Sequence, residues 1–125
     1  MTKINSRRKG HDWERLVARE CRLEWPEARR GMQGDGARVP DVDGTPFWIE
    51  CKCGSAAYVR DLGRFARQAA KDALAADDPR PIRIMVKTTP RGGTMVLSVG
   101  YLRDGRLSIT VLAAHLADWF LRGCP

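Results

Sequence analysis

Residues 40–53, with the sequence PDVDGTPFWIECKC, are the most informative stretch of this 125-residue chain. Their second half, residues 47–53, is rich in aromatic and β-branched side chains and is typical of a buried strand. Residues 39–43 predict a second strand, and Gly44 and Pro46 between the two are typical of a loop. The sequence therefore predicts a β-hairpin at the centre of the fold.

The pairing register of this hairpin decides which side chains meet. If Asp41 lies opposite Glu50, residues 44–47 form the connecting loop, which suits the glycine and the proline in it. A tight turn at Asp43-Gly44 would instead place Asp41 opposite Pro46, which has no N–H to donate to a neighbouring strand. We therefore prefer the first register, which brings the carboxylates of Asp41 and Glu50 close together.

Side chains alternate along a strand, so Trp48, Glu50 and Lys52 share one face and the odd-numbered residues 49–53 share the other. The odd-numbered side chains are isoleucine and cysteine, which suit packing against a helix. The first face carries two charged side chains on a strand otherwise suited to burial, a conflict expected at functional sites. In the preferred register Asp41 joins Glu50 and Lys52 on this face.

Two carboxylates beside a lysine suit Mg²⁺-assisted hydrolysis of phosphodiesters. Mg²⁺ binds through one or two carboxylates, keeps several waters and accepts phosphate oxygens as ligands. We expect Asp41 and Glu50 to hold the metal, and the ammonium group of Lys52 to orient the attacking water or to offset charge on the phosphate. The alternative interpretation is structural: Asp41 lies in a turn, and Glu50 and Lys52 form the solvated face of a strand.

The remaining pattern predicts one α/β domain. Apolar spacing from His11 predicts a helix that ends before Pro26, preceded by a flexible basic arm at residues 1–10. Residues 60–76 predict a second helix with a small-residue apolar face and a basic face. The other expected elements are strands at residues 28–32, 82–86 and 94–99, a turn at Asp104-Gly105 and an amphipathic C-terminal helix over residues 112–120. Residues 11–125 therefore predict a single domain with a mixed central sheet flanked by helices.

The charge of the chain favours an anionic partner. The net charge is +7, from 22 basic and 15 acidic residues, and 17 of the basic residues are arginine. Planar guanidinium groups match phosphate oxygens, so nucleic acid is the first candidate, although many soluble proteins without such a partner are equally basic.

The chain lacks the sequence features of a membrane or secreted protein. No apolar run approaches the roughly 20 residues that a membrane span needs, and no signal-peptide core follows the basic start. We therefore expect a cytoplasmic protein. Cys51 and Cys53 lack the C-x-x-C spacing of a zinc knuckle, so reduced thiols are favoured over zinc ligands.

The chain resembles the PD-(D/E)XK nuclease superfamily, whose members have the restriction-endonuclease-like fold, through Pro40-Asp41 and Glu50-Cys51-Lys52. Lys9-Gly10 with Glu14-Arg15 is similar to the start of the Holliday-junction resolvase branch. The resemblance spans roughly residues 7–75 and implies an αβββαβ core. It also implies that Glu14 completes the acidic site, that the Cys51 carbonyl is a further metal ligand, and that Mn²⁺ can replace Mg²⁺.

The resemblance implies DNA, in particular branched DNA, as the partner, and a homodimer that makes two symmetric cuts. Residues 33–36 depart from the resolvase branch, which carries a serine in this loop. A nuclease of the same fold for linear, flapped or single-stranded DNA therefore stays open, as does a non-catalytic DNA-binding module. Gln68 resembles the helix glutamine of other branches. The candidate phosphate contacts are Arg7, Arg8, Lys9, Arg30, Arg38, Arg60, Arg64, Arg67 and Lys71.

Overall fold

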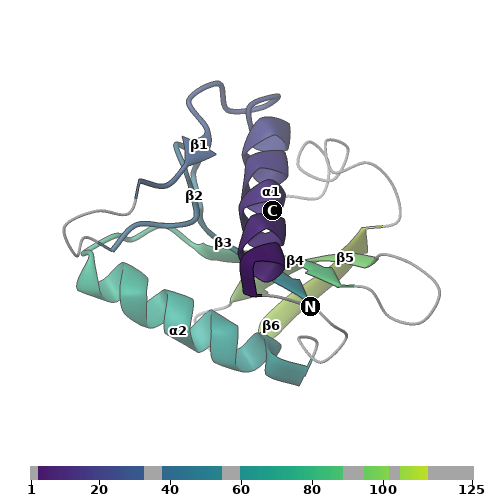
Figure 1. Cartoon of the computed structure of the whole chain (residues 1–125). Coiled ribbons are helices and arrows are strands. Elements are labelled where there is room, and N and C mark those ends of the chain that lie inside the picture. The colour runs from purple at the N-terminus through teal and green to yellow at the C-terminus, as the bar shows by residue number, and fades with distance from the viewer. Residues whose placement is uncertain (1–2, 33–37, 55–59, 89–94, 102–104, 113–125) are drawn as a thin grey trace.

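The structure is a computed structural model that describes residues 3–32, 38–54, 60–88, 95–101 and 105–112. It is an α/β fold with one mixed six-stranded sheet in the order β1-β2-β3-β4-β5-β6 (Figure 1). β3 and β4 are parallel, and the other neighbouring strands are antiparallel. The elements are α1 (Lys3–Cys21), β1 (Arg29–Arg30), β2 (Val42–Asp43), β3 (Trp48–Gly54), α2 (Leu62–Ala75), β4 (Ile82–Thr88), β5 (Met95–Tyr101) and β6 (Leu107–Leu112).

The two helices pack against opposite faces of the sheet. The α1 side of the core contains Trp13 and Val17 of the helix together with Ile49 and Cys51 of β3. The α2 side contains the small-residue face of the helix, packed against Trp48 and the alternate residues of β4 and β5. This face was expected from the sequence, and its buried residues are Leu62, Ala66, Ala69 and Ala73. Parallel strands need a crossover connection, and α2 supplies it between β3 and β4.

The central hairpin has the predicted register. Val42 lies opposite Ile49, which is the pairing that also sets Asp41 against Glu50. The predicted alternation along β3 is confirmed as well, because Ile49 packs on the α1 side and Trp48 on the α2 side. Gly44 in the connecting loop has a φ of +80°, a left-handed conformation that favours glycine.

Other expectations need correction. The first helix begins at Lys3 rather than at His11, so residues 3–10, expected to form a flexible arm, belong to α1. No acidic residue occupies the first turn of α1, and Asp12 lies inside the helix, where it pairs with Arg15. The expectation of an arm rested on the basic residues of this segment and its lack of Asp and Glu, but lysine and arginine are themselves good helix formers.

The C-terminal part also differs from expectation. Leu112 was assigned to a final helix, but it ends β6, which adds a sixth strand to the sheet by pairing with β5. The rest of that expected helix lies outside the described residues. In the described part of the chain, neither helix has the length and apolar character needed to cross a membrane.

Candidate active site

The position of Asp41 is fixed by the backbone on both sides of it. Its N–H donates to the carbonyl of Ile49 over 2.9 Å, and its own carbonyl accepts from the N–H of Gly31 over 2.8 Å. Its carboxylate oxygen Oδ2 accepts a 2.8 Å hydrogen bond from the N–H of Cys51. Asp41 therefore presents its carboxylate to β3 next to Glu50.

Gly31 permits this arrangement because it has no side chain. A Cβ atom at Gly31 would lie 1.9 Å from the carbonyl oxygen of Pro40, far inside van der Waals contact. Pro40 is fully buried, so it has little room to move away. Glycine at this position therefore allows the chain before Asp41 to approach β1 closely.

Glu50 is held in a largely buried position by Trp48 and Asp41. The indole Nε1–H of Trp48 donates a 2.9 Å hydrogen bond to Oε1 of Glu50. Burial, the negative charge of Asp41 and a hydrogen bond between the two carboxyl groups raise the pKa of Glu50 to about 8, although Lys52 opposes the rise. Two carboxyl groups this close retain a proton between them near neutral pH unless a cation compensates the second charge.

Lys52 completes the polar face of β3 that the sequence predicted. Its positive charge acts on Glu50, two residues earlier on the same face. Its ammonium nitrogen Nζ lies 4.9 Å from the centre of the Phe65 ring on α2. An ammonium group within about 6 Å of an aromatic ring centre is attracted to the face of the ring. Phe65 therefore holds Lys52 between the sheet and α2.

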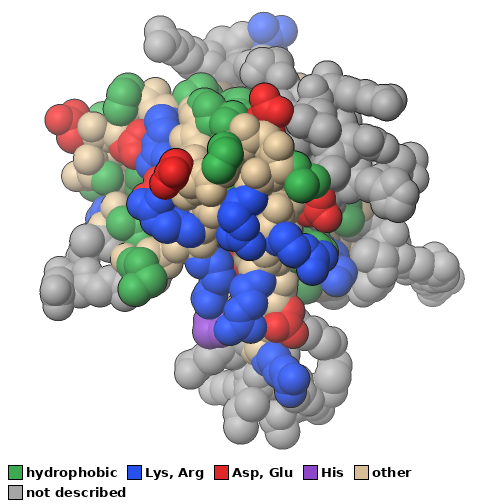
Figure 2. All heavy atoms as spheres, turned by 90° about the horizontal axis from the view of Figure 1, so that it is seen from above, with side chains coloured by type: hydrophobic (Ala, Val, Ile, Leu, Met, Phe, Trp, Pro, Cys, Tyr) green, Lys and Arg blue, Asp and Glu red, His purple; other side chains and the backbone are tan. Residues whose placement is uncertain are grey.

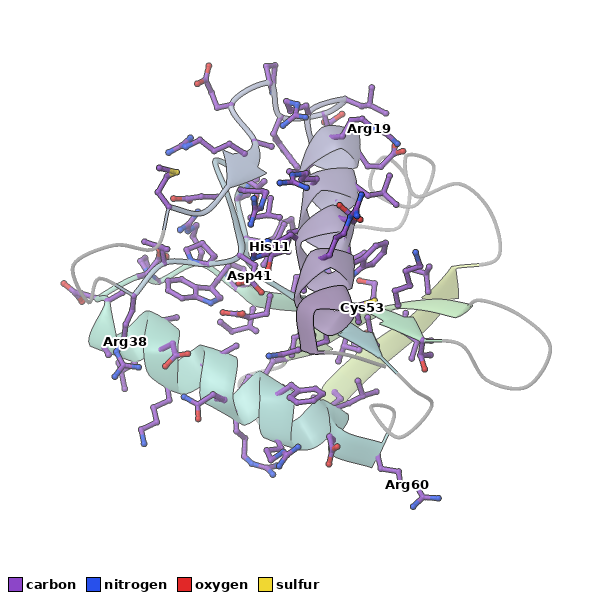
Figure 3. The ribbon with its side chains drawn as sticks, viewed as in Figure 1. His11, Arg19, Arg38, Asp41, Cys53 and Arg60 are labelled. Carbon is purple, nitrogen blue, oxygen red and sulfur yellow. The ribbon has the colours of Figure 1, made fainter. Side chains whose placement is uncertain are left out.

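Glu14 and Asp41 line one small cavity between α1 and the start of β2. The cavity has a volume of about 240 Å³ and is lined by His11, Glu14, Arg30, Gly31 and Asp41. Figure 3 shows His11 and Asp41 next to each other here. Burial and the charge of Asp41 raise the pKa of Glu14, while Arg30 opposes this rise through a 3.1 Å ion pair. The four predicted catalytic residues, Glu14, Asp41, Glu50 and Lys52, thus lie within electrostatic reach of a neighbour in the set.

The donor set fits a small hard cation held by few protein ligands. Within the described residues, no group of three or more His, Cys, Asp or Glu side chains is arranged to hold a metal ion. Mg²⁺ does not need such a group, because it usually binds through one or two carboxylates and fills its shell with water and phosphate. The carboxyl groups of Asp41 and Glu50 lie next to each other and match that requirement. Burial and mutual repulsion disfavour two negative charges here, so a bound cation would stabilise the pair.

Cys51 and Glu14 have other partners in the structure. The N–H of Cys51 holds Asp41, and its thiol lies fully buried on the α1 side, where burial raises its pKa. This burial favours the protonated thiol, and a role for the Cys51 carbonyl as a metal ligand stays a prediction. Arg30 donates from Nε and from its terminal nitrogen to Oε1 of Glu14, at 3.2 and 3.1 Å. The positive charge of Arg30 therefore compensates the negative charge of Glu14 beside the acidic pair.

The predicted phosphate contacts fall into two groups. Arg30 and Arg38 pair with acidic side chains, Arg30 with Glu14 and Arg38 with Asp72 of α2. Arg64 pairs with Asp61 over 3.3 Å but stays 68% exposed. The other described candidates, all of them exposed, are Arg8, Arg60, Arg67 and Lys71. The side chains of Arg7 and Lys9 lie outside what the structure describes.

Sequence reasoning gave no role to three residues that shape this site. Trp48 was placed on the correct face, but its hydrogen bond to Glu50 was not foreseen; its position two residues before Glu50 was the available signal. His11 lies one helical turn before Glu14 and lines the same cavity, a spacing that could have been noticed. Nothing in the sequence indicated the close approach at Gly31, except that this glycine lies within the strand predicted at residues 28–32. Gln68 is exposed and donates to Asp72 over 3.0 Å.

Comparison of the chain with models of protein families, with curated proteins and with solved structures found no match.

Proposed function

We propose that this protein is a Mg²⁺-dependent DNA endonuclease that hydrolyses phosphodiester bonds. The observation that carries the proposal is the contact between the carboxyl groups of Asp41 and Glu50, with Lys52 on the same face of β3. A partly buried pair of acids is costly for a fold. The hydrogen bond from the Cys51 N–H gives Asp41 a structural role in the hairpin, but it does not account for Glu50 beside it. Binding of a cation, and through it of an anionic substrate, would account for the two adjacent acids.

The order of elements supports the same proposal. The first six elements follow the order α1, β1, β2, β3, α2 and β4, which is the order of the restriction-endonuclease-like core that the resemblance implies. Asp41 precedes β2, and Glu50 and Lys52 lie on β3. These are the positions at which the resemblance to the PD-(D/E)XK superfamily places its acidic residues and its lysine.

Each residue of the site has a separate role in this proposal. Asp41 and Glu50 would hold Mg²⁺, with Mn²⁺ as a substitute, and a bound ion would polarise the phosphoryl group and lower the pKa of a coordinated water. Lys52, held by Phe65, orients the attacking water and offsets the charge that develops on the phosphate. Trp48 fixes one oxygen of Glu50, so the carboxylate needs little rearrangement to bind a cation.

The preferred substrate in this proposal is branched DNA, as in the Holliday-junction resolvase branch. A chain of 125 residues covers one side of a junction, so two symmetric cuts need two copies. We therefore include a homodimer in the proposal. Exposed basic side chains on α2 and just before it would contact phosphates without reading the sequence, namely Arg64, Arg67 and Lys71 of α2 and Arg60 before it.

A cleavage assay tests the proposal. Labelled four-way junction, flap, linear duplex and single strand are incubated with the protein in Mg²⁺, Mn²⁺, Ca²⁺ or EDTA. We expect cleavage in Mg²⁺ or Mn²⁺, none in EDTA, and binding without turnover in Ca²⁺, which accepts looser geometry. Glu50→Gln should abolish cleavage, whereas Glu24→Gln, at an exposed glutamate after α1, should retain it. Full activity in EDTA, or in Glu50→Gln, would contradict the proposal.

A further inference from the structure

A second basic surface lies along the outside of α1. A hollow of about 610 Å³ on this side is lined by four arginines, namely Arg15, Arg19, Arg22 and Arg30. Asp12, which pairs with Arg15 over 3.1 Å, is the acidic residue in its lining. Figure 3 labels Arg19 near the upper end of α1, and Figure 2 looks down from that side onto a group of Lys and Arg side chains. The lining therefore has a net positive charge, although Arg15 pairs with Asp12 and Arg30 with Glu14.

The spacing of the helix arginines suits a linear anion. Arg15 and Arg19 of α1 and Arg22 directly after it follow one another at intervals of four and three residues. The N–H of Arg22 still bonds to the Ala18 carbonyl over 3.1 Å, so the three lie along one side of the helix and its last turn. The helix rises about 10 Å between Arg15 and Arg22. Phosphates of a duplex strand follow one another by about 3.4 Å along its axis, so this row spans about three of them. A single phosphate or a small anion would use only part of it.

The hollow is joined to the acidic site by one shared residue. Arg30 lines the arginine hollow and also lines the cavity that contains Glu14 and Asp41. A strand lying along Arg15, Arg19 and Arg22 would therefore continue past Arg30 toward the carboxyl pair. The two carboxylates of that cavity repel an acidic peptide and a nucleic-acid strand alike unless a cation lies between them. The nucleic-acid strand, however, brings to the cavity the phosphodiester that the site is proposed to cut, and an acidic peptide does not.

We propose that Arg15 and Arg19 on α1, with Arg22 at its C-terminal end, form the surface that binds the sugar-phosphate backbone of the substrate strand beyond the cut. This inference rests on the proposed nuclease function for the direction of the strand. It adds a specific surface on α1 to the basic face of α2. Guanidinium groups supply the contacts, because their planar donors match phosphate oxygens.

Salt titration of DNA binding tests this surface directly. Affinity for a fluorescein-labelled linear duplex is measured in EDTA, so that no cleavage occurs, at several salt concentrations. Arg19→Ala should weaken binding about threefold to tenfold and lower the salt slope by about one, because each phosphate contact releases counterions. Arg15→Ala/Arg19→Ala should lower the slope by about two. Arg106→Ala, which removes the same charge at an exposed position before β6, should leave the slope unchanged.

The possible results separate this inference from the nuclease proposal. A wild-type slope in Arg19→Ala and in the double variant, with unchanged thermal unfolding, overturns the α1 surface. Displacement of the duplex by polyglutamate as effectively as by unlabelled duplex also overturns it, because the surface would then suit an acidic protein. A lowered slope without any Mg²⁺-dependent cleavage by the wild type supports the DNA surface and refutes the nuclease. A wild-type slope together with loss of cleavage in Glu50→Gln refutes the α1 surface alone.

Discussion

The indole N–H of Trp48 donates a hydrogen bond of 2.9 Å to Oε1 of Glu50, two residues further along β3. Trp48 is only 1% exposed and packs among the side chains that α2 covers, so its ring has a fixed orientation. One oxygen of Glu50 is therefore tied to the core. The carboxyl group then lies next to Asp41 without the freedom to turn toward solvent.

Replacing Trp48 by phenylalanine should loosen Glu50 while keeping most of the packing. In Trp48→Phe we expect the Mg²⁺ concentration for half-maximal cleavage to rise about threefold to tenfold, because an ordinary intramolecular hydrogen bond contributes about 0.5–1.5 kcal/mol. The matched control is Trp13→Phe, which removes the buried hydrogen bond to the Met85 carbonyl (3.0 Å). It should lower stability by about 1–3 kcal/mol and leave the Mg²⁺ dependence unchanged. Equal Mg²⁺ dependence in the two variants would contradict a positioning role for Trp48.

Removal of Lys52 should separate catalysis from binding. Lys52→Met should abolish cleavage but change affinity for DNA by less than about threefold, since exposed basic residues elsewhere supply most of the binding. Lys87→Met, at a lysine that lies 5.8 Å from the Trp13 ring, is the control and should cleave normally. Single-turnover cleavage and fluorescence anisotropy measure the two effects. Normal cleavage by Lys52→Met would show that Lys52 has no part in the chemistry.

The raised pKa of Glu50 makes stability depend on pH. The pKa rises from the ordinary value of 4.5 to about 8 in the folded protein, so the folded state holds this proton more tightly than the unfolded chain. The corresponding stability is complete below pH 4.5 and is lost as the pH rises through about 8. In EDTA, we therefore expect the Tm to fall over this range.

Glu50→Gln should remove most of this dependence. At pH 9 it should melt several °C above the wild type, because about 1 kcal/mol moves the Tm of a small domain by about 4 °C. At pH 5 the two proteins should melt alike. Glu24→Gln should follow the wild-type curve. A wild-type Tm that stays flat between pH 5 and pH 9, or rises, would show that Glu50 does not retain its proton.

The register of the hairpin could be predicted because its sequence excludes the alternative. Pro46 lacks an N–H, so a register that places it opposite Asp41 loses a ladder hydrogen bond, and Val42 indeed pairs with Ile49. The alternation of β3 and the buried face of α2 were also predictable, because each depends on residues within one element. Local spacing therefore located Asp41, Glu50 and Lys52 correctly relative to one another.

The partners of the arginines could not be predicted in this way. Arg30 binds Glu14 across 16 residues, and Arg38 binds Asp72 across 34 residues. These pairs form only when α1 and α2 have packed on the sheet. The hydrophobic periodicity of a single element does not show how that element packs against the others. The charge of a residue is visible in the sequence, but whether another side chain already neutralises it depends on the tertiary fold.

The close approach at Gly31 predicts a stability defect at the site. Gly31→Ala places a Cβ atom where the Pro40 carbonyl lies, so we expect a loss of about 2–4 kcal/mol and at least tenfold slower cleavage as Asp41 moves. Gly10→Ala is the control in which the same substitution meets no obstacle, because nothing lies within 4 Å of the Cβ position of Gly10 inside α1. It should stabilise the protein by about 0.5–1 kcal/mol. Urea unfolding measures both, and a stable, fully active Gly31→Ala protein would show that Asp41 does not depend on this contact.

Substrate shape gives the last prediction, which tests the branched-DNA part of the proposal. A four-way junction brings phosphates from several arms together, so a homodimer with basic surfaces on both copies should neutralise more phosphates there than on a linear duplex. Affinity for the junction should be higher and should fall more steeply with salt, because the slope grows with the number of phosphates neutralised. Salt titrations of a junction and a duplex of the same sequence measure this, and light scattering gives the mass of the complex. Mg²⁺ should then produce paired, symmetric nicks near the branch point. Equal slopes, or a monomer on the junction, would exclude a resolvase and leave a nuclease for linear, flapped or single-stranded DNA.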